Sequence, residues 1–299
     1  MKESWKKVLV TGVAGFIGSN LADRLVKLGY EVIGVDNLSR GRRENINPKV
    51  KFYELDIRNK NIWGIMGGVD TVFHLAALAR IQPSITDPLE YHDNNVNGTL
   101  NILNAAANVG VRRIVYSSSS SVYGNQKKMP EVETMLPNPL HPYGATKLIG
   151  EYYMKVWANC YKIDTVSLRY FNVYGPRQVT EGAYATVIGI FLKQKSNGNP
   201  MTIVGDGEQR RSFAYVDDVV EANIRAMTTK RKLNGEVINV GYPKSYSINE
   251  VANIIGGDKI HVKPRLFEVR ETLPDIKRAY TCLAWKPKID LREGIRRLK

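Results

Sequence analysis

Short apolar runs alternate with helical patterns through the first half of the chain. The runs are rich in β-branched residues and occupy Lys7–Thr11, Glu31–Asp36, Lys51–Leu55, Thr71–Leu75, Arg113–Ser117 and Thr165–Tyr170. The helical patterns lie between them at Phe16–Leu28, Pro88–Val109 and Tyr143–Tyr161, and each is long enough to cross a sheet face. This alternation predicts an α/β fold built on a doubly wound parallel sheet.

The pattern changes after about Tyr174, where glycine and proline breaks separate shorter elements. We therefore expect residues 1–174 to form the main lobe and residues 175–299 to form most of a smaller α/β lobe. The helical run Asp217–Ala226 and the strand-like Val237–Val240 are expected to return to the first sheet. A segment near 213–241 then joins the main lobe.

Composition and charge restrict the class of protein. The 299 residues are 43% hydrophobic, which suffices for a full core. The net charge of +14 is spread over short clusters, so a basic surface around a phosphate-bearing substrate is favoured over a nucleic-acid groove.

Cys160 and Cys282 lack histidines at zinc-site spacing, and free thiols are expected. No apolar stretch reaches membrane-spanning length and the first residues do not resemble a signal peptide, so we expect a cytoplasmic protein.

A glycine-punctuated turn, Gly12-x-x-Gly15-x-x-Gly18, follows the first predicted strand. Glycines there allow a tight turn, close approach of backbone amides to a pyrophosphate, and packing of helix on strand. Asp36 ends the next strand, where its carboxylate can accept both hydroxyls of an adenosine ribose and would repel a 2′-phosphate. These features predict NAD binding, although Arg40, Arg42 and Arg43 nearby could accommodate the extra phosphate of NADP.

Candidate acid/base residues follow the fifth predicted strand. A serine run, residues 117–121, begins where that strand ends, and one of its hydroxyls could bond a substrate oxygen. Tyr143 and Lys147 come about 20 residues later and share one face of a helix. A lysine ammonium near a phenol favours the ionised phenol, so Lys147 and the positive nicotinamide ring are expected to lower the pKa of Tyr143 from its usual value near 10. This predicts a tyrosine general base beside a nicotinamide cofactor.

Taken in order, these motifs resemble the extended short-chain dehydrogenases/reductases, and among them the UDP-sugar 4-epimerases. The resemblance runs almost end to end. It is carried by the glycine turn, Asp36, Asp56-Ile57, His74-Leu75-Ala76-Ala77, Asn94-Asn95-Val96-Asn97-Gly98-Thr99, the serine run, Tyr143/Lys147 and Arg169-Tyr170-Phe171-Asn172-Val173-Tyr174-Gly175-Pro176.

The resemblance implies roles for individual residues. Tyr143 would be the base, Lys147 its electrostatic partner, and Ser119 the hydroxyl that bridges Tyr143 and the sugar O4. The residues implied to bind NAD are Gly12, Gly15, Phe16, Ile17, Asp36, Asn37, Ser39, Gly41, Asp56, Ile57, Leu75, Ala76, Ala77, Asn94, Ser117, Tyr143, Lys147 and Tyr170. Those implied to bind a UDP-sugar are Ser119, Tyr143, Asn172, Val187, Thr202, Arg211, Arg265, Glu268 and Thr272.

Two departures from the family pattern matter for specificity. Phe267 replaces the usual glycine in the segment that carries Arg265 and Glu268. Thr272 stands where a bulky tyrosine in some relatives excludes N-acetyl groups, so the resemblance implies turnover of UDP-GlcNAc/GalNAc as well as UDP-Glc/Gal.

Epimerisation at C4 through a 4-keto sugar is the implied reaction. Related dehydratases carry an Asp-Glu pair where this chain has Ser120-Ser121, which disfavours dehydration. A UDP-glucuronate epimerase or decarboxylase, a dTDP-sugar dehydratase and a non-catalytic dinucleotide-binding protein remain alternatives. No metal is expected. The resemblance also implies a homodimer that pairs the helices at 88–109 and 143–161.

Overall fold

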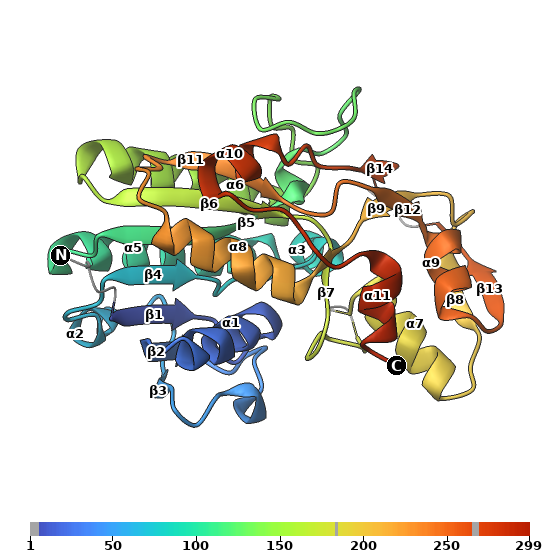
Figure 1. Cartoon of the computed structure of the whole chain (residues 1–299), viewed down its shortest axis with the longest axis horizontal. Coiled ribbons are helices and arrows are strands. Elements are labelled where there is room, and N and C mark those ends of the chain that lie inside the picture. Colours follow the sequence, from blue (N-terminus) through green and yellow to red (C-terminus); the bar gives the residue numbers. More distant parts are fainter. Residues whose placement is uncertain (1–5, 183–184, 265–268) are drawn as a thin grey trace.

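The computed structural model describes residues 6–182, 185–264 and 269–299, and a parallel sheet runs through its larger part (Figure 1). The strand order is β11-β6-β5-β4-β1-β2-β3, and every neighbouring pair is parallel. This confirms the predicted doubly wound α/β fold. The strands are β1 (Lys7–Thr11), β2 (Glu31–Asp36), β3 (Lys51–Glu54), β4 (Thr71–His74), β5 (Arg113–Ser119), β6 (Asp164–Tyr170) and β11 (Glu236–Val240).

Helices cover both faces of this sheet because its strands are apolar on both sides. Val8 and Val10 of β1 pack into the core formed with α1 (Phe16–Lys27) and α8 (Val216–Thr228). Leu9, between them, packs on the opposite face with α2 (Ile62–Ile65), α5 (Gly98–Val109) and α6 (Pro142–Cys160). The period of two along the strand therefore divides the core into two layers.

The helix predicted at Pro88–Val109 is interrupted, which corrects that prediction. It consists of α4 (Pro88–His92), a π-helical segment η2 (Asp93–Asn97) and α5. In η2 the buried Asn95 side chain accepts from the backbone N–H of Leu78 (2.8 Å) and donates to its carbonyl (2.9 Å). The wider π turn places this amide against the loop that follows β4, at the edge of the site described below.

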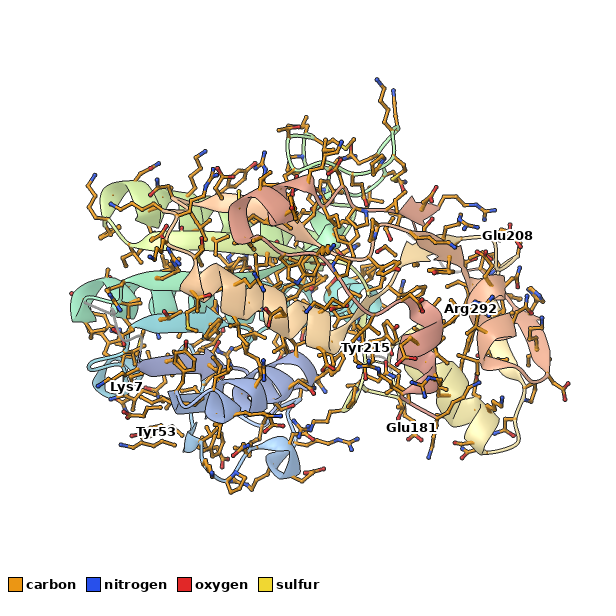
Figure 2. The ribbon with its side chains drawn as sticks, viewed as in Figure 1. Lys7, Tyr53, Glu181, Glu208, Tyr215 and Arg292 are labelled. Carbon is orange, nitrogen blue, oxygen red and sulfur yellow. The ribbon has the colours of Figure 1, made fainter. Side chains whose placement is uncertain are left out.

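A smaller lobe follows β6. Its described residues form three small sheets: β8 (Met201–Val204) with β13 (Lys259–Val262), β9 (Arg210–Ser212) with β12 (Ser245–Ser247) and β14 (Glu271–Thr272), and β7 (Val173–Tyr174) with β10 (Ala214–Tyr215). Helices α7 (Val187–Ser196), α9 (Ile248–Ile255) and α11 (Leu291–Arg296) pack around them, while α10 (Lys277–Leu283) lies beside β11. Figure 2 labels Lys7 on the larger lobe and Glu208 on the smaller lobe.

The chain returns to the large sheet between these small strands. After β10 it forms α8 and then β11, whose residues 236–240 pair in parallel with residues 166–170 of β6. The domain limits at 174, 213 and 241 stay predictions. Within the described ranges, no helix is both long and apolar enough to cross a bilayer, and no group of three or more His, Cys, Asp or Glu residues is arranged to hold a metal ion.

Candidate active site

A cavity of about 430 Å³ lies at the carboxyl ends of the large sheet's strands. Residues that directly follow or end β1, β2, β4, β5 and β6 line it, because parallel strands all end at the same edge. The glycine turn, Asp36, the serine run and the Tyr143/Lys147 pair, which are far apart in sequence, therefore meet in one place.

The glycine turn shapes one wall of this cavity. Gly12 has φ +71°, and a Cβ there would lie 2.8 Å from the backbone nitrogen of Ala76. A Cβ on Gly18 would lie 2.1 Å from the carbonyl oxygen of Gly12. Helix α1 begins after Gly15 without a side-chain cap and without an acidic residue in its first turn. Its first backbone N–H groups are thus suited to an anion, and the wall fits a dinucleotide pyrophosphate.

Asp36 is held at the cavity edge by the same turn. Its carboxylate accepts from the backbone N–H groups of Ala14 (3.0 Å) and Leu38 (2.8 Å). Burial raises the pKa of Asp36, and these two hydrogen bonds oppose the rise. A Cβ on Gly41 would come within 2.9 Å of both carboxylate oxygens, so the loop closes tightly over the acid. A fixed carboxylate here fits the ribose of NAD, as the sequence predicted.

The start of α6 positions the predicted base. His141 is the N-cap, and its Nδ1 accepts from the backbone N–H of Gly144 (3.1 Å). Tyr143 and Lys147 follow on the first two turns, and both line the cavity with Ser119. Ser119 is the last residue of β5, where its hydroxyl accepts from the backbone N–H of Ser121 (3.1 Å). The three predicted catalytic side chains are therefore brought together.

Lys147 is fixed by the strand beneath it rather than by Tyr143. Its Nζ donates to the carbonyl oxygen of Ser117 (2.7 Å) and lies 4.9 Å from the centroid of the Tyr116 ring. Burial lowers the pKa of Lys147 to about 7, and the charge of Glu151 acts in the opposite direction. Burial thus weakens the preference of Lys147 for its charged form.

In the protein without cofactor, Lys147 is not among the groups that lower the pKa of Tyr143, and its effect together with the nicotinamide ring stays a prediction. Burial raises the pKa of the phenol above its ordinary value of 10.0. The opposing influences are a hydrogen bond with the Ser119 side chain and the positive charge of Arg80. The effect of desolvation on the pKa is larger than the combined effect of these two groups, and the spacing of residues along the helix does not report it.

A buried ion pair between Glu151 and Arg169 lies close to Lys147. Glu151 accepts from Arg169 Nε (2.8 Å) and Nη2 (2.7 Å), and from the Ser118 hydroxyl (2.5 Å). Both charged side chains are only 3% exposed. Glu151 lies one turn beyond Lys147 on α6, so this pair ties the helix to β5 and β6 beneath the reaction centre.

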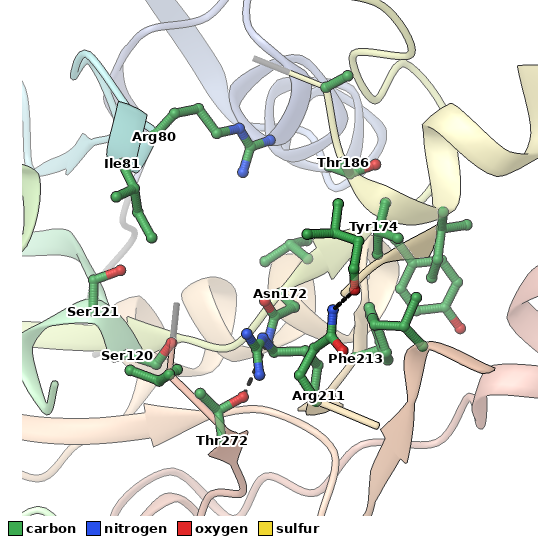
Figure 3. A pocket seen from close by; sticks show the side chains of 18 of the residues that line it. Arg80, Ile81, Ser120, Ser121, Asn172, Tyr174, Thr186, Arg211, Phe213 and Thr272 are labelled. Atoms are coloured by element: carbon green, nitrogen blue, oxygen red, sulfur yellow. Dashed lines mark hydrogen bonds between the residues drawn. The ribbon is translucent and has the colours of Figure 1, made fainter. Parts of the chain in front are cut away.

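A second cavity, of about 290 Å³, opens on the side of the smaller lobe (Figure 3). Asn172 donates from Nδ2 to the Ser212 carbonyl (2.9 Å) and to the Thr272 hydroxyl (3.3 Å). Figure 3 shows Asn172, Arg211 and Thr272 on one side and Arg80 and Ile81 on the other. Among the described residues, six line both cavities: Arg80, Ile81, Ser120, Ser121, Asn172 and Val173.

Most of the predicted site residues line one of these two cavities. The larger is lined by all the predicted NAD residues except Asp56, and the smaller by Asn172, Val187, Thr202, Arg211 and Thr272. Asp56 lies outside the lining: its carboxylate is paired with Arg58 and accepts from Asn37, and the hydrogen bonds from Arg58 lower its pKa to about 2. Arg265 and Glu268 fall outside the described residues.

Sequence reasoning missed Arg80 and His141, which both line the smaller cavity. A signal existed for each. Arg80 is a lone charge in the apolar run that follows His74, and His141 is a titratable group two residues before the predicted base.

Comparison with known proteins agrees with the fold and with the cavity at the edge of its sheet. Residues 8–241 match the model of the NAD dependent epimerase/dehydratase family. A putative UDP-glucose 4-epimerase of Methanocaldococcus jannaschii is 42% identical over 300 residues, which cover 97% of this chain and 96% of the relative. The UDP-glucose 4-epimerase of Thermotoga maritima, solved with UDP-glucose, superposes with a TM-score of 0.93 at 38% identity, covering 97% of this chain and 96% of that one.

A third similar protein is the UDP-N-acetylglucosamine 4-epimerase of Methanobrevibacter ruminantium, solved with UDP-N-acetylmuramic acid. It gives a TM-score of 0.92 at 37% identity, and the match covers 98% of both chains. Together with the fold and the cavity that fits NAD, these matches assign the chain to the NAD dependent epimerase/dehydratase family.

Proposed function

We propose that this enzyme catalyses the reversible C4 epimerisation of a UDP-hexose through a 4-keto intermediate. The observation that carries the proposal is the convergence of Ser119, Tyr143 and Lys147 on the cavity that also holds the glycine turn and Asp36. That cavity shares lining residues with a second one whose wall carries Arg211, a guanidinium suited to a diphosphate.

The chain's own residues supply the proton transfers. Bound NAD⁺ supplies the hydride acceptor and, once reduced, the donor. Tyr143 takes the O4 proton while C4 is oxidised, and it returns a proton to O4 after the keto sugar has presented its other face. Ser119 hydrogen-bonds O4 and the phenol. Lys147, held by the Ser117 carbonyl, orients the cofactor ribose and adds positive charge when protonated.

The residues at the junction of the two cavities favour epimerisation over elimination. Ser120 and Ser121 line both cavities. Neither hydroxyl titrates near neutral pH, so neither can act as the additional acid/base that loss of water from the sugar requires. This is the physical argument against a dTDP-sugar dehydratase.

We propose further that the sugar pocket accepts a C2 acetamido group. Thr272 lines the smaller cavity, and its hydroxyl is held by Asn172. A tyrosine at this position would fill space that threonine leaves open. Thr272→Tyr is therefore expected to lower kcat/KM for UDP-GalNAc by more than about tenfold while UDP-galactose changes little, since a steric clash affects only the larger sugar.

Separate incubations with UDP-Gal, UDP-GalNAc, UDP-Glc, UDP-GlcNAc and UDP-GlcA, with the products resolved, measure this selectivity. Thr272→Ser, which keeps the hydroxyl, is the control and is expected to behave like the wild type. If the wild type converts UDP-galactose but not UDP-GalNAc, the pocket proposal is wrong. If it acts on UDP-GlcA alone, the enzyme is a uronate epimerase or decarboxylase, and the hexose assignment fails.

We also propose that the protein is a homodimer formed through α4 and α6. Leu89 on α4 is 81% exposed, and Tyr152 and Val156 on α6 are 58% and 44% exposed. Light scattering is expected to give twice the 33.7 kDa of one chain, and Leu89→Glu is expected to shift the mass toward the monomer. A wild-type mass of one chain at micromolar concentration contradicts the proposal. A cytoplasmic location stays a prediction.

A further inference from the structure

Arg80 occupies the junction of the two cavities. It ends the loop that follows β4 and directly precedes α3 (Ile81–Thr86). It lines both cavities, and Figure 3 shows its side chain extending into the open space on the side opposite Arg211 and Thr272. A guanidinium is therefore placed where the two bound molecules would meet.

The backbone of Arg80 lies in a region that favours glycine. Its φ is +109° and its ψ is +148°, a combination in which a Cβ crowds the backbone. Such strain persists where the surroundings require it, and it is concentrated at functional sites. A glycine at this position would relieve the strain, and yet the chain carries an arginine.

Arg80 and Tyr143 line the same cavity. In agreement with this placement, the positive charge of Arg80 lowers the pKa of the phenol and opposes the larger effect of burial. Among the described residues, the titratable groups near this phenol include Tyr91 from α4, Tyr116 from β5, and His141 and Lys147 from α6 and its cap.

These neighbours contribute little fixed charge. Burial raises the pKa of Tyr116 well above its ordinary value and lowers the pKa of His141, so both favour the neutral form. Burial also lowers the pKa of Lys147 and so disfavours its charged form. An arginine, by contrast, keeps its charge throughout the working range of pH.

We propose that Arg80 is a positioning residue of the reaction, which holds a permanent positive charge near the Tyr143 phenol and keeps a strained backbone in order to do so. The inference rests on the proposed role of Tyr143 as the base. On the Tyr-x-x-x-Lys spacing alone, Lys147 would be the residue that stabilises the ionised phenol of Tyr143. The proposal gives part of this role to Arg80.

The test compares Arg80→Gly with Arg80→Lys in the full-length, NAD-loaded enzyme. Since the ionised phenol is the active form, kcat/KM rises with pH through the pKa of Tyr143. Removal of the positive charge raises that pKa, so the ascending limb of Arg80→Gly is expected to move to higher pH. For every pH unit that the limb moves, the rate at a fixed pH below it falls about tenfold, and above the limb the rate recovers toward the wild-type value. Arg80→Lys keeps the charge and is expected to stay near the wild-type limb.

Thermal unfolding supplies a second readout. Arg80→Gly is expected to unfold at the same temperature as the wild type or higher, because glycine fits the backbone. Arg177→Gly is the matched control: Arg177 also has a positive φ, +67°, but it is ion-paired with Asp23 and lines neither cavity. Its pH profile is expected to match that of the wild type.

Two results overturn the proposal while leaving the epimerase assignment intact. One is an active wild type whose ascending limb is unchanged in Arg80→Gly. The other is a loss of rate in Arg80→Gly that persists at high pH, which would indicate a direct contact rather than an electrostatic effect. A wild type that interconverts no UDP-sugar instead defeats the proposed function itself.

Discussion

Tyr143→Phe is expected to lower turnover by about 10²–10⁴-fold or more while NAD⁺ binding is retained. The substitution removes one oxygen and keeps the ring, which packs edge-on against Tyr91 with centroids 6.5 Å apart. The proton of the sugar hydroxyl then loses its proposed acceptor, the Tyr143 oxygen, while Lys147 stays held by its hydrogen bond to the Ser117 carbonyl. Steady-state rates and NAD⁺ binding, measured on the same preparation, separate the two effects.

Tyr161→Phe serves as the control for this experiment. Tyr161 caps the far end of the same helix, is 51% exposed and stacks on Trp157, so loss of its hydroxyl is expected to leave turnover unchanged. Tyr143→Phe activity within about tenfold of the wild type would rule out general-base catalysis by this phenol.

The second large effect is expected for the buried ion pair beneath the reaction centre. Removing one partner of such a pair costs about 3–5 kcal/mol, because the other charge stays buried and uncompensated. In Glu151→Leu, Arg169 would keep a guanidinium that is 3% exposed and whose Nη1 already lacks a hydrogen-bond partner among the described residues. A large loss of stability is therefore expected, measured by the urea dependence of unfolding.

The double variant Glu151→Leu/Arg169→Met tests the reason for this loss. If an unpaired buried charge is responsible, the double variant is more stable than Glu151→Leu alone. Glu293→Gln, which weakens the surface ion pairs with Arg296 and Arg297, is the surface control and is expected to change stability little. A small loss in Glu151→Leu, similar to that of the surface control, contradicts this account.

Strand positions were largely predictable because hydrophobic patterning dominates in a sheet that is buried on both faces. The exception is the end of β5. The sequence predicts a strand to Ser117 and a polar loop beyond it, but β5 continues to Ser119 and pairs there with Tyr170. Buried partners satisfy these hydroxyls: Ser117 bonds the Tyr170 hydroxyl (3.1 Å) and Ser118 bonds Glu151. Such partners lie far along the chain, and local polarity does not reveal them.

The positions of the candidate site residues could be predicted where the spacing of a motif reflects backbone geometry. The pKa values of the acid/base residues could not be predicted, because burial controls them. The glycine turn and Asp36 are placed by one strand-turn-helix unit, and both line the cavity. The pKa values of Tyr143 and Lys147 depend instead on desolvation by surrounding elements, which spacing along one helix does not report. The lone charge of Arg80 in an apolar run is visible in the sequence, but its φ and its place between the two cavities are properties of the folded chain.

The late return of β11 to the large sheet has a consequence for synthesis. A nascent chain that has emerged only as far as β10 carries six of the seven strands, and one edge of β6 still has no strand beside it. Exposed strand edges promote association between chains, and pairing between distant segments is slow. The free edge of β6 therefore stays open to association with other chains until residue 240 has left the ribosomal exit tunnel. The strands that line the cofactor cavity have emerged well before that point.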